Sequence, residues 1–258
     1  MFGWEVVIQF LFVGALFFGF GALELAFPAE HGQTVKGKLR NVLFAAILLV
    51  SGTIIVYYMD RFFPIRFRVL PDRGALFSGM VLIAYIFLTD CIFYWYHRAQ
   101  HAFRSLWLIH ELHHSDRELN VTTSMRTYWL ERPIQTAAII MPITFLVGID
   151  MTAIAAFPFI MIGWLLFTHA NLRLELGFLS PIFCGPQVHR IHHSLEPRHQ
   201  GKNFAQFFPL IDIAFGTYYA PARGEFPPTG VPDLLSEASV MRMMVRPFVG
   251  WFARISGK

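Results

Sequence analysis

Five long apolar stretches dominate the sequence and limit the folds that are open to it. A helix needs about 20 apolar residues to cross the hydrocarbon core of a bilayer. Most of the stretches approach or exceed that length, and the fourth is barely long enough. They cover residues 4–27, 41–59, 74–96, 133–149 and 151–171. We therefore expect an all-α integral membrane protein, multi-pass, with about four to five transmembrane helices.

Composition agrees with this class. Hydrophobic residues make up 55% of the chain and the mean hydropathy is +0.49, while charged residues make up only 15%, against about 25% in soluble domains. The net charge of +4 could suggest nucleic acid, but the basic residues flank apolar stretches, as in loops that face anionic headgroups. No nucleic-acid partner is expected. Two cysteines, Cys91 and Cys184, indicate neither a disulfide framework nor a cysteine metal site.

The order of these stretches predicts three parts. Residues 1–73 form an N-terminal transmembrane hairpin with a basic connecting segment. Residues 74–220 form a domain that carries the histidine motifs and contains a second transmembrane hairpin at 133–171. Residues 221–258 form a basic amphipathic tail that lies on the membrane surface.

The second hairpin, with Asp150 at its turn, returns the chain to the side of the membrane that it left. It should therefore bring residues 97–132 and 169–193 together as a histidine-rich helical cap. Under the positive-inside rule, loops rich in Lys and Arg face the cytoplasm. The arginines in 60–73 lie on the opposite side from the histidines and would favour that side as cytoplasmic. The larger basic C-terminal part favours histidines on the cytoplasmic side.

Nine of the eleven histidines fall into four clusters. Helical positions i, i+3 and i+4 share a face, so the rings of one cluster can reach one site. The clusters are His97 and His101, then His110, His113 and His114, then His169 alone, and last His189, His192 and His193.

These clusters predict a dimetal centre. A chance HxxHH would occur in such a chain with a probability on the order of a few per cent, so two are very improbable. Crowded imidazoles beside a bilayer also need partners. Nine ligands are too many for one ion, and two ions with four or five nitrogens each use the set. Zinc, copper, iron and nickel all remain open.

The order HxxxH, HxxHH, isolated histidine, HxxHH resembles the fatty acid hydroxylase/sterol desaturase superfamily of membrane di-iron enzymes. The neighbouring segments NVTTSMR at 120–126, HANLRL at 169–174 and NFAQFFPLIDIAFGTYY at 203–219 look like the bacterial members and the ether-lipid monooxygenase branch. The likeness covers roughly residues 80–220.

The resemblance implies two iron ions on the nine histidines, with zinc as a possible substitute, and O₂-dependent hydroxylation of a C–H bond in a lipid-like substrate (fatty acyl, sterol-like or ether lipid). Some fatty acid hydroxylases carry a further histidine where this chain has Arg173, so Asn171 is a candidate extra contact at the metals. No flavin, nicotinamide, haem or iron–sulfur motif is visible. We therefore expect a separate cytochrome, ferredoxin or reductase to supply electrons.

Asp90 is the first candidate for a supporting role. It interrupts an apolar stretch, and intramembrane charges are usually functional. It lies two helical turns before His97, so we expect it to accept a hydrogen bond from a ligand imidazole or to bind a metal-linked water. Other candidates for contacting the ligands are Glu111, Asp116 and Asp212. His31 and His199 lie outside the pattern and are expected at the surface.

Three alternatives remain open. A lipid desaturase would use the same di-iron centre. A dizinc membrane hydrolase would need a carboxylate base beside the metals and no electron donor. A metal transporter would place its ligands near the middle of the bilayer, whereas these histidines lie at the ends of the apolar stretches and beyond.

Overall fold

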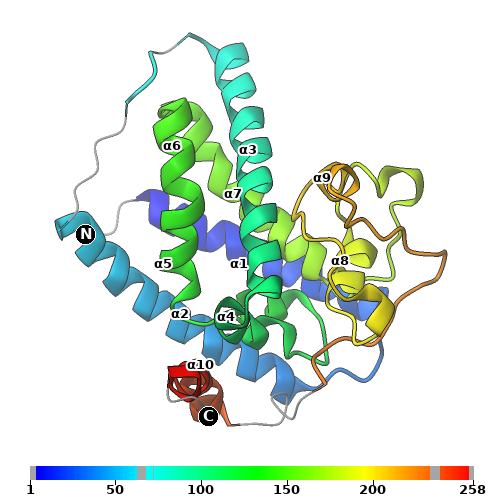
Figure 1. The fold of residues 1–258 in the computed structure, drawn as a ribbon. Helices are drawn as coiled ribbons and strands as arrows, with labels where there is room; N and C mark the ends of the chain where they lie inside the picture. Colours follow the sequence, from blue (N-terminus) through cyan, green and yellow to red (C-terminus); the bar gives the residue numbers. More distant parts are fainter. Residues whose placement is uncertain (1–3, 63–67, 72, 233–238, 256–258) are drawn as a thin grey trace.

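The computed structural model describes residues 4–62, 68–71, 73–232 and 239–255, which form helices joined by loops (Figure 1). β-Structure in this part of the chain is limited to three isolated bridges. Among the described residues, three helices are long and apolar enough to cross a membrane. They are α2 (Val35–Phe62) over Val35–Ile55, α3 (Ala75–Ala102) along its whole length, and α7 (Met151–His169) over Thr152–His169. The expected all-α membrane fold is confirmed.

Two further apolar helical segments accompany these three. Helix α1 (Trp4–Ala26) packs along α7, and its apolar part within the described residues is Leu11–Ala26. Helix α2 packs against the short 3₁₀ helix η1 (Val121–Met125). These contacts connect the N-terminal helices to the histidine-bearing part of the chain.

Helix α3 extends further than the apolar stretch predicts. It continues past residue 96 and ends at Ala102, and the backbone of the next residue, Phe103, is extended. Helix α4 (Arg104–His114) follows at once and carries the second histidine cluster. The first cluster therefore occupies the last two turns of α3 and is rigidly connected to its apolar part.

The predicted hairpin is present, but its first arm is not a regular helix. It consists of α5 (Glu131–Gln135), the π-helix η2 (Thr136–Ile140) and α6 (Met141–Val147). Pro142 stands at the start of α6 and has no N–H for the preceding turn, which removes one i→i−4 hydrogen bond at this junction. π-Helical turns are frequent at functional sites.

The hairpin turn is tightly fixed. Gly148 has φ 87°, and a Cβ there would lie 2.9 Å from the Arg68 carbonyl oxygen, so glycine is required. Asp150 caps α7 by accepting a hydrogen bond from the Ala153 N–H at 2.8 Å. The predicted turn at Asp150 is confirmed.

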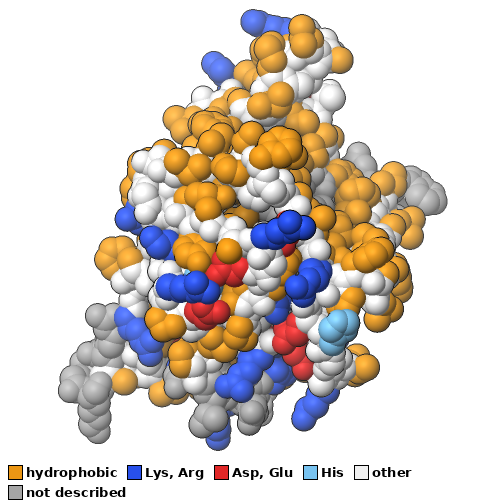
Figure 2. Space-filling view, turned by 90° about the vertical axis from the view of Figure 1, so that its right-hand side faces the viewer, with side chains coloured by type: hydrophobic (Ala, Val, Ile, Leu, Met, Phe, Trp, Pro, Cys, Tyr) orange, Lys and Arg blue, Asp and Glu red, His pale blue; other side chains and the backbone are white. Residues whose placement is uncertain are grey.

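The rest of the chain covers the ends of α3 and α7 that bear the histidines. Helix α8 (Pro186–His192) packs against α7, and α9 (Leu210–Ala214) packs against α3 (Figure 1). The short 3₁₀ helices η3 (Gly177–Leu179) and η4 (Pro197–His199) lie in the segments before and after α8. Helix α10 (Val240–Ile255) packs against α4. In Figure 2 the upper half of the visible face is mostly hydrophobic, and most charged side chains gather in the lower half.

Candidate metal centre

The nine predicted histidines converge at the C-terminal ends of α3 and α7. They form two groups, and within each group the ligand nitrogens lie within 4.8 Å of one another. The first group is His97, His101, His110, His114 and His192, and the second is His113, His169, His189 and His193. All are buried except His101, which is partly buried. The division into five and four nitrogens matches the expected two ions.

Each HxxHH cluster contributes to both groups. His110 and His114 face the first group, as i and i+4 residues of one helix face do, while His113 between them turns to the second. In the last cluster, His189 and His193 face the second group, and His192 between them faces the first. Both α4 and the segment formed by α8 and His193 therefore carry ligands of each group.

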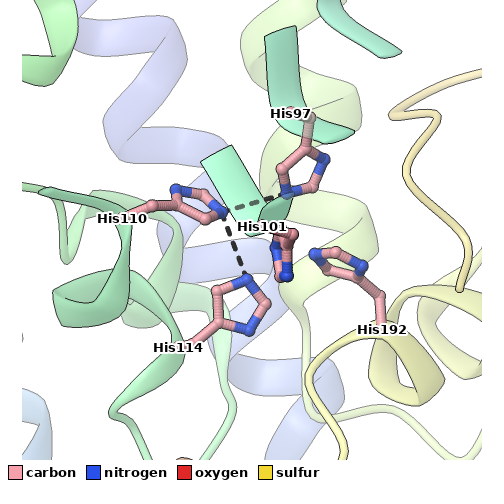
Figure 3. Close-up of side chains that lie close together, drawn as sticks. All are labelled: His97, His101, His110, His114 and His192. Atoms are coloured by element: carbon pink, nitrogen blue, oxygen red, sulfur yellow. Dashed lines mark hydrogen bonds between the residues drawn. The ribbon is translucent and has the colours of Figure 1, made fainter. Parts of the chain in front are cut away.

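Hydrogen bonds fix which ring nitrogen is free in the first group. Nδ1 of His97 lies 2.8 Å from the Phe204 carbonyl oxygen, and Nδ1 of His110 lies 2.9 Å from Glu131 Oε1. These oxygens accept, so Nδ1 carries the proton and Nε2 of the neutral ring has a lone pair. The two Nε2 atoms lie 3.0 Å apart (Figure 3). Two lone pairs at this distance cannot satisfy each other, but a cation satisfies both.

In the second group the ring of His169 is fixed in the same way, whereas Nδ1 of His113 and of His189 has no hydrogen-bond partner among the described residues. Nδ1 of His169 donates to the Leu165 carbonyl at 2.8 Å, and its Nε2 lies 3.1 Å from Nε2 of His113 and 3.0 Å from Nε2 of His189. In the first group, Nδ1 of His192 donates to the Lys202 carbonyl at 2.9 Å. The His192 Nε2 atom is buried and has no hydrogen-bond partner in the described chain. The residues therefore fit two metal ions.

Burial keeps these imidazoles in the form that binds metals. It lowers the pKa of His192 to about 3, and it lowers the pKa values of His113, His114, His189 and His193 well below the usual value. A metal-bound histidine must be neutral. At neutral pH the nitrogens are ready to coordinate a cation without first releasing a proton.

Glu131 is a functional residue that the sequence interpretation missed. Its Oε1 accepts hydrogen bonds from His110 Nδ1 and from Gln100 Nε2, both at 2.9 Å. A carboxylate behind a ligand imidazole fixes the ring and increases its basicity. In sequence Glu131 is followed by Arg132 and Pro133 and resembles an ordinary loop charge. Its only signal is its position at the start of an apolar helical arm.

Asp90 is buried, and of its two predicted contacts the hydrogen bond from a ligand imidazole is not found among the described residues, while the metal-linked water stays a prediction. Its oxygens accept the backbone N–H groups of Gln206 at 2.8 Å, Phe207 at 3.1 Å and Phe208 at 2.6 Å. Asp212 binds the same loop through the N–H groups of Phe204 and Ala205. The loop in turn presents the Phe204 carbonyl to His97. The two aspartates are therefore connected to His97 through the backbone of this loop.

Asn171 does not belong to either group of ligand nitrogens. Its Oδ1 accepts the Glu30 N–H at 3.0 Å and its Nδ2 donates to the Glu30 carbonyl at 2.8 Å. Both polar atoms are therefore used to hold the loop after α1. Two acidic candidates also have other partners. Glu111 binds Arg246 and Asp116 binds Asn41.

The two remaining histidines differ from each other. His31 is exposed, as predicted. His199 was expected at the surface, and that prediction is wrong, because it is 1% exposed. Its Nδ1 lies 2.8 Å from Ser194 Oγ and its Nε2 lies 3.3 Å from Glu225 Oε1. The short helix η4 turns this ring inward, which spacing alone does not indicate.

A cavity of about 340 Å³ leads from the histidines into the apolar part of the molecule. Its walls come from α3, from the arm α5–η2 and from α7. Histidines of both groups form one end of it, including His97, His110, His113, His169 and His189. A bound molecule can therefore reach both candidate metal positions.

Comparison with known proteins identifies the class of this fold and site. The sequence model of the fatty acid hydroxylase family matches residues 82–217, which is more than half of the 258-residue chain. The chain belongs to the fatty acid hydroxylase family. The matched segment contains all nine clustered histidines.

Several curated relatives share this region. An alkylglycerol monooxygenase from Danio rerio is 32% identical over 171 residues, which cover 63% of this chain and 34% of the relative. The ornithine lipid hydroxylase OlsE from Rhizobium tropici is 28% identical over 184 residues, covering 69% of this chain and 53% of the relative. The matched region thus spans between about a third and about half of these relatives. No solved structure matches the chain.

Proposed function

We propose that this protein is a membrane oxidoreductase that uses two iron ions and O₂ to hydroxylate a C–H bond of a lipid. The observation that carries the proposal is the pair of facing Nε2 atoms of His97 and His110, 3.0 Å apart with both Nδ1 protons donated elsewhere. The convergence of Nε2 of His113 and of His189 on Nε2 of His169 supports a second ion. Membership of the fatty acid hydroxylase family favours iron over the other metals that imidazole can bind.

The residues of this chain would hold the ions and shape the space beside them. Bound iron would supply the activation of O₂, and zinc could replace it in the site. Four ligand rings are oriented by hydrogen bonds that their Nδ1 atoms donate. The acceptors are the Glu131 carboxylate and the backbone carbonyls of Phe204, Leu165 and Lys202. The apolar walls of the cavity keep water from the reacting C–H bond, and the cavity end at the histidines brings that bond to the metals.

The names of the relatives support a lipid substrate, since they describe an alkylglycerol monooxygenase and an ornithine lipid hydroxylase. Reduction of O₂ requires electrons, which we assign to a separate cytochrome, ferredoxin or reductase. We further propose four to five membrane spans, with the histidine end on the cytoplasmic side. The exposed apolar side chains of α10, Met241, Val245, Phe248 and Phe252, support contact of this helix with the membrane surface.

The test combines metal analysis, O₂ uptake and lipid profiling of cells with and without the gene. We expect two irons per active chain, O₂ consumption that depends on a reductant, and a lipid that gains one oxygen. Loss of two hydrogens instead would identify a desaturase. Activity with zinc and without O₂ would identify a hydrolase and refute the proposal.

A further inference from the structure

Two short segments outside the long apolar helices expose apolar side chains. One segment is residues 178–182, which begins in η3, and the other is residues 210–215, which contains α9. We name their exposed apolar side chains the apolar rim, which consists of Phe178, Leu179, Ile182, Leu210, Ile213 and Phe215. Phe178 is 87% exposed, and the other members are between 37% and 50% exposed. Gathered apolar side chains of this kind mark a surface that binds a partner.

The two segments of the rim are joined and uncharged. The Cys184 N–H donates a hydrogen bond to the Phe207 carbonyl at 2.9 Å, which connects the end of one segment to the start of the other. Residues 176–184 contain no Lys, Arg, Asp or Glu, and the single charged residue of 203–219, Asp212, is buried. The rim therefore presents an apolar surface without a charge of its own.

Helix α3 carries a lipid-facing surface that leads to the rim. Exposed apolar side chains recur along this helix every three or four residues, and they are Leu76, Met80, Ile83 and Phe87. The ring of Phe87 lies 6.1 Å from that of Phe208, and the ring of Trp95 lies 4.8 Å from that of Phe215. Helix α9 lies beside α3 on the side of the molecule that Figure 2 presents, whose upper half is mostly hydrophobic (Figures 1 and 2). The rim is therefore continuous with the surface of a helix that is apolar enough to cross a membrane.

The rise of α3 gives the depth of the rim in a bilayer. A helix rises about 1.5 Å per residue, so Trp95 lies about 28 Å from the first residue of the exposed stripe, close to the thickness of a hydrocarbon core of about 30 Å. Tryptophan is frequent at the boundary between hydrocarbon and headgroups. Phe215, beside Trp95, then lies at this boundary, and Phe208, beside Phe87, lies about 12 Å deeper. Residues 208–215 cover the interval between these depths.

The rim is connected to a metal ligand through one loop. Asp90 of α3 and Asp212 of α9 accept backbone N–H groups of residues 204–208. The Phe204 carbonyl in this loop accepts the hydrogen bond from Nδ1 of His97 at 2.8 Å. A partner that holds the rim therefore restrains the loop that orients His97.

We propose that the apolar rim is inserted into the bilayer beside α3, in the leaflet on the histidine side, and that it anchors the loop 204–208 in the membrane. The partner is the acyl-chain region of the lipid bilayer, because the rim is uncharged and continues the lipid-facing stripe of α3. The inference rests on the membrane fold of the chain and not on the proposed oxidation of a lipid.

The first test measures the surroundings of the rim with nitroxide labels on single cysteines. The labels are attached to Phe178→Cys and Ile213→Cys in a chain whose Cys91 and Cys184 are replaced by alanine. The labelled chains are reconstituted into phosphatidylcholine bilayers. Relaxation of each label by O₂, which concentrates among acyl chains, is compared with relaxation by a nickel chelate, which stays in water.

Two exposed positions serve as references for this measurement. Met80→Cys reports on lipid, since it lies in the stripe of α3, and His31→Cys reports on water, since it lies in the loop between α1 and α2. We expect O₂ to dominate at Phe178 and Ile213 as it does at Met80, and the nickel chelate to dominate at His31. Dominance of the nickel chelate at either rim position would overturn the proposal. Protection from both reagents would also overturn it, because a protein, either a second copy or another partner, would then cover the rim.

The second test asks whether insertion of the rim holds the loop. Ile213→Lys places a charge where the proposal places lipid, which is unfavourable, and it changes a side chain that is 46% exposed. For the zinc-loaded protein in bilayers we expect a roughly tenfold or larger loss of metal affinity in a chelator titration, the scale typical of lost contacts behind a ligand. This measurement does not depend on whether the protein oxidises a lipid.

Val35→Lys is the matched control. Val35 is an apolar residue with 73% exposure that stands next to Lys36 at the start of α2. A lysine there reaches water beside an existing charge, so metal affinity should stay at the wild-type value. Wild-type affinity in Ile213→Lys as well would overturn the anchoring of the loop by the rim.

Discussion

Glu131 Oε1 lies 2.9 Å from Nδ1 of His110, and this hydrogen bond joins the base of the second hairpin to the metal-ligand helix α4. Both side chains are buried, with 1% and 4% exposure. The bond therefore holds the start of the α5–η2 arm, which lines the cavity, in a fixed position relative to His110 of the first group.

Replacing Glu131 by alanine should weaken metal binding at the first group. His110 would lose the acceptor that holds its ring and sets its tautomer, and losses of this kind typically cost about 10–100-fold in metal affinity or activity. Metal content of the purified protein during titration with a chelator measures the effect. The contrast with Glu131→Gln is informative, because only alanine removes the acceptor. Equal metal retention in both variants and the wild type would contradict the role assigned to Oε1.

Single ligand substitutions should remove metal and activity together. His110→Ala, His114→Ala and His193→Ala each take away a nitrogen from a group of four or five, and the remaining buried imidazoles are left without a cation to satisfy them. We expect loss of at least one ion per chain by elemental analysis and no detectable lipid oxidation.

The control for this series is His31→Ala, since His31 is exposed and lies outside both groups. His199→Ala is unsuitable as a neutral control, because that ring is buried against Ser194 and Glu225. Full activity in His193→Ala would refute its assignment as a ligand.

The parts of this structure that are local in sequence are the parts that could be predicted. The four histidine clusters and the hairpin turn at Asp150 depend on spacing along one helix or on one short turn. Glu131, by contrast, meets His110 only because α5 returns against α4, and a contact of this kind has no periodic signature. The apolar surroundings of Asp90 predict a supporting role for it, but its partners at 206–208 depend on how a distant loop folds.

Glu24 should contribute to stability and not to chemistry. This buried carboxylate of α1 accepts the backbone N–H of Val121 at 2.6 Å and of Asn171 at 2.8 Å. Glu24→Ala would leave two buried donors unsatisfied, at a cost of about 1–3 kcal/mol for each. We expect a lower unfolding midpoint in detergent, with near-normal metal per folded molecule. Leu25→Ala, at a neighbouring position that is 82% exposed, is the matched control and should leave the midpoint unchanged.

Asp90→Asn tests whether a residue can support the metals through backbone alone. The carboxylate accepts three backbone N–H groups from residues 206–208. Asparagine keeps the shape, but its amide nitrogen faces N–H groups that need an acceptor. The loop should loosen, and with it the Phe204 carbonyl that holds His97 at 2.8 Å. We expect metal affinity of the first group to fall by roughly the 10–100-fold that is typical of lost supporting contacts.

Two measurements separate this role of Asp90 from a purely structural one. Iron per folded protein reports on the ligands, and turnover per iron reports on the chemistry. A role through His97 lowers iron per folded molecule, and a purely structural role lowers only the yield of folded protein. Asp212→Asn is the companion variant, because Asp212 holds the same loop through Phe204 and Ala205 at 2.8 and 2.9 Å. It should reduce iron content in the same direction, and wild-type iron content in both variants would show that the loop does not position His97.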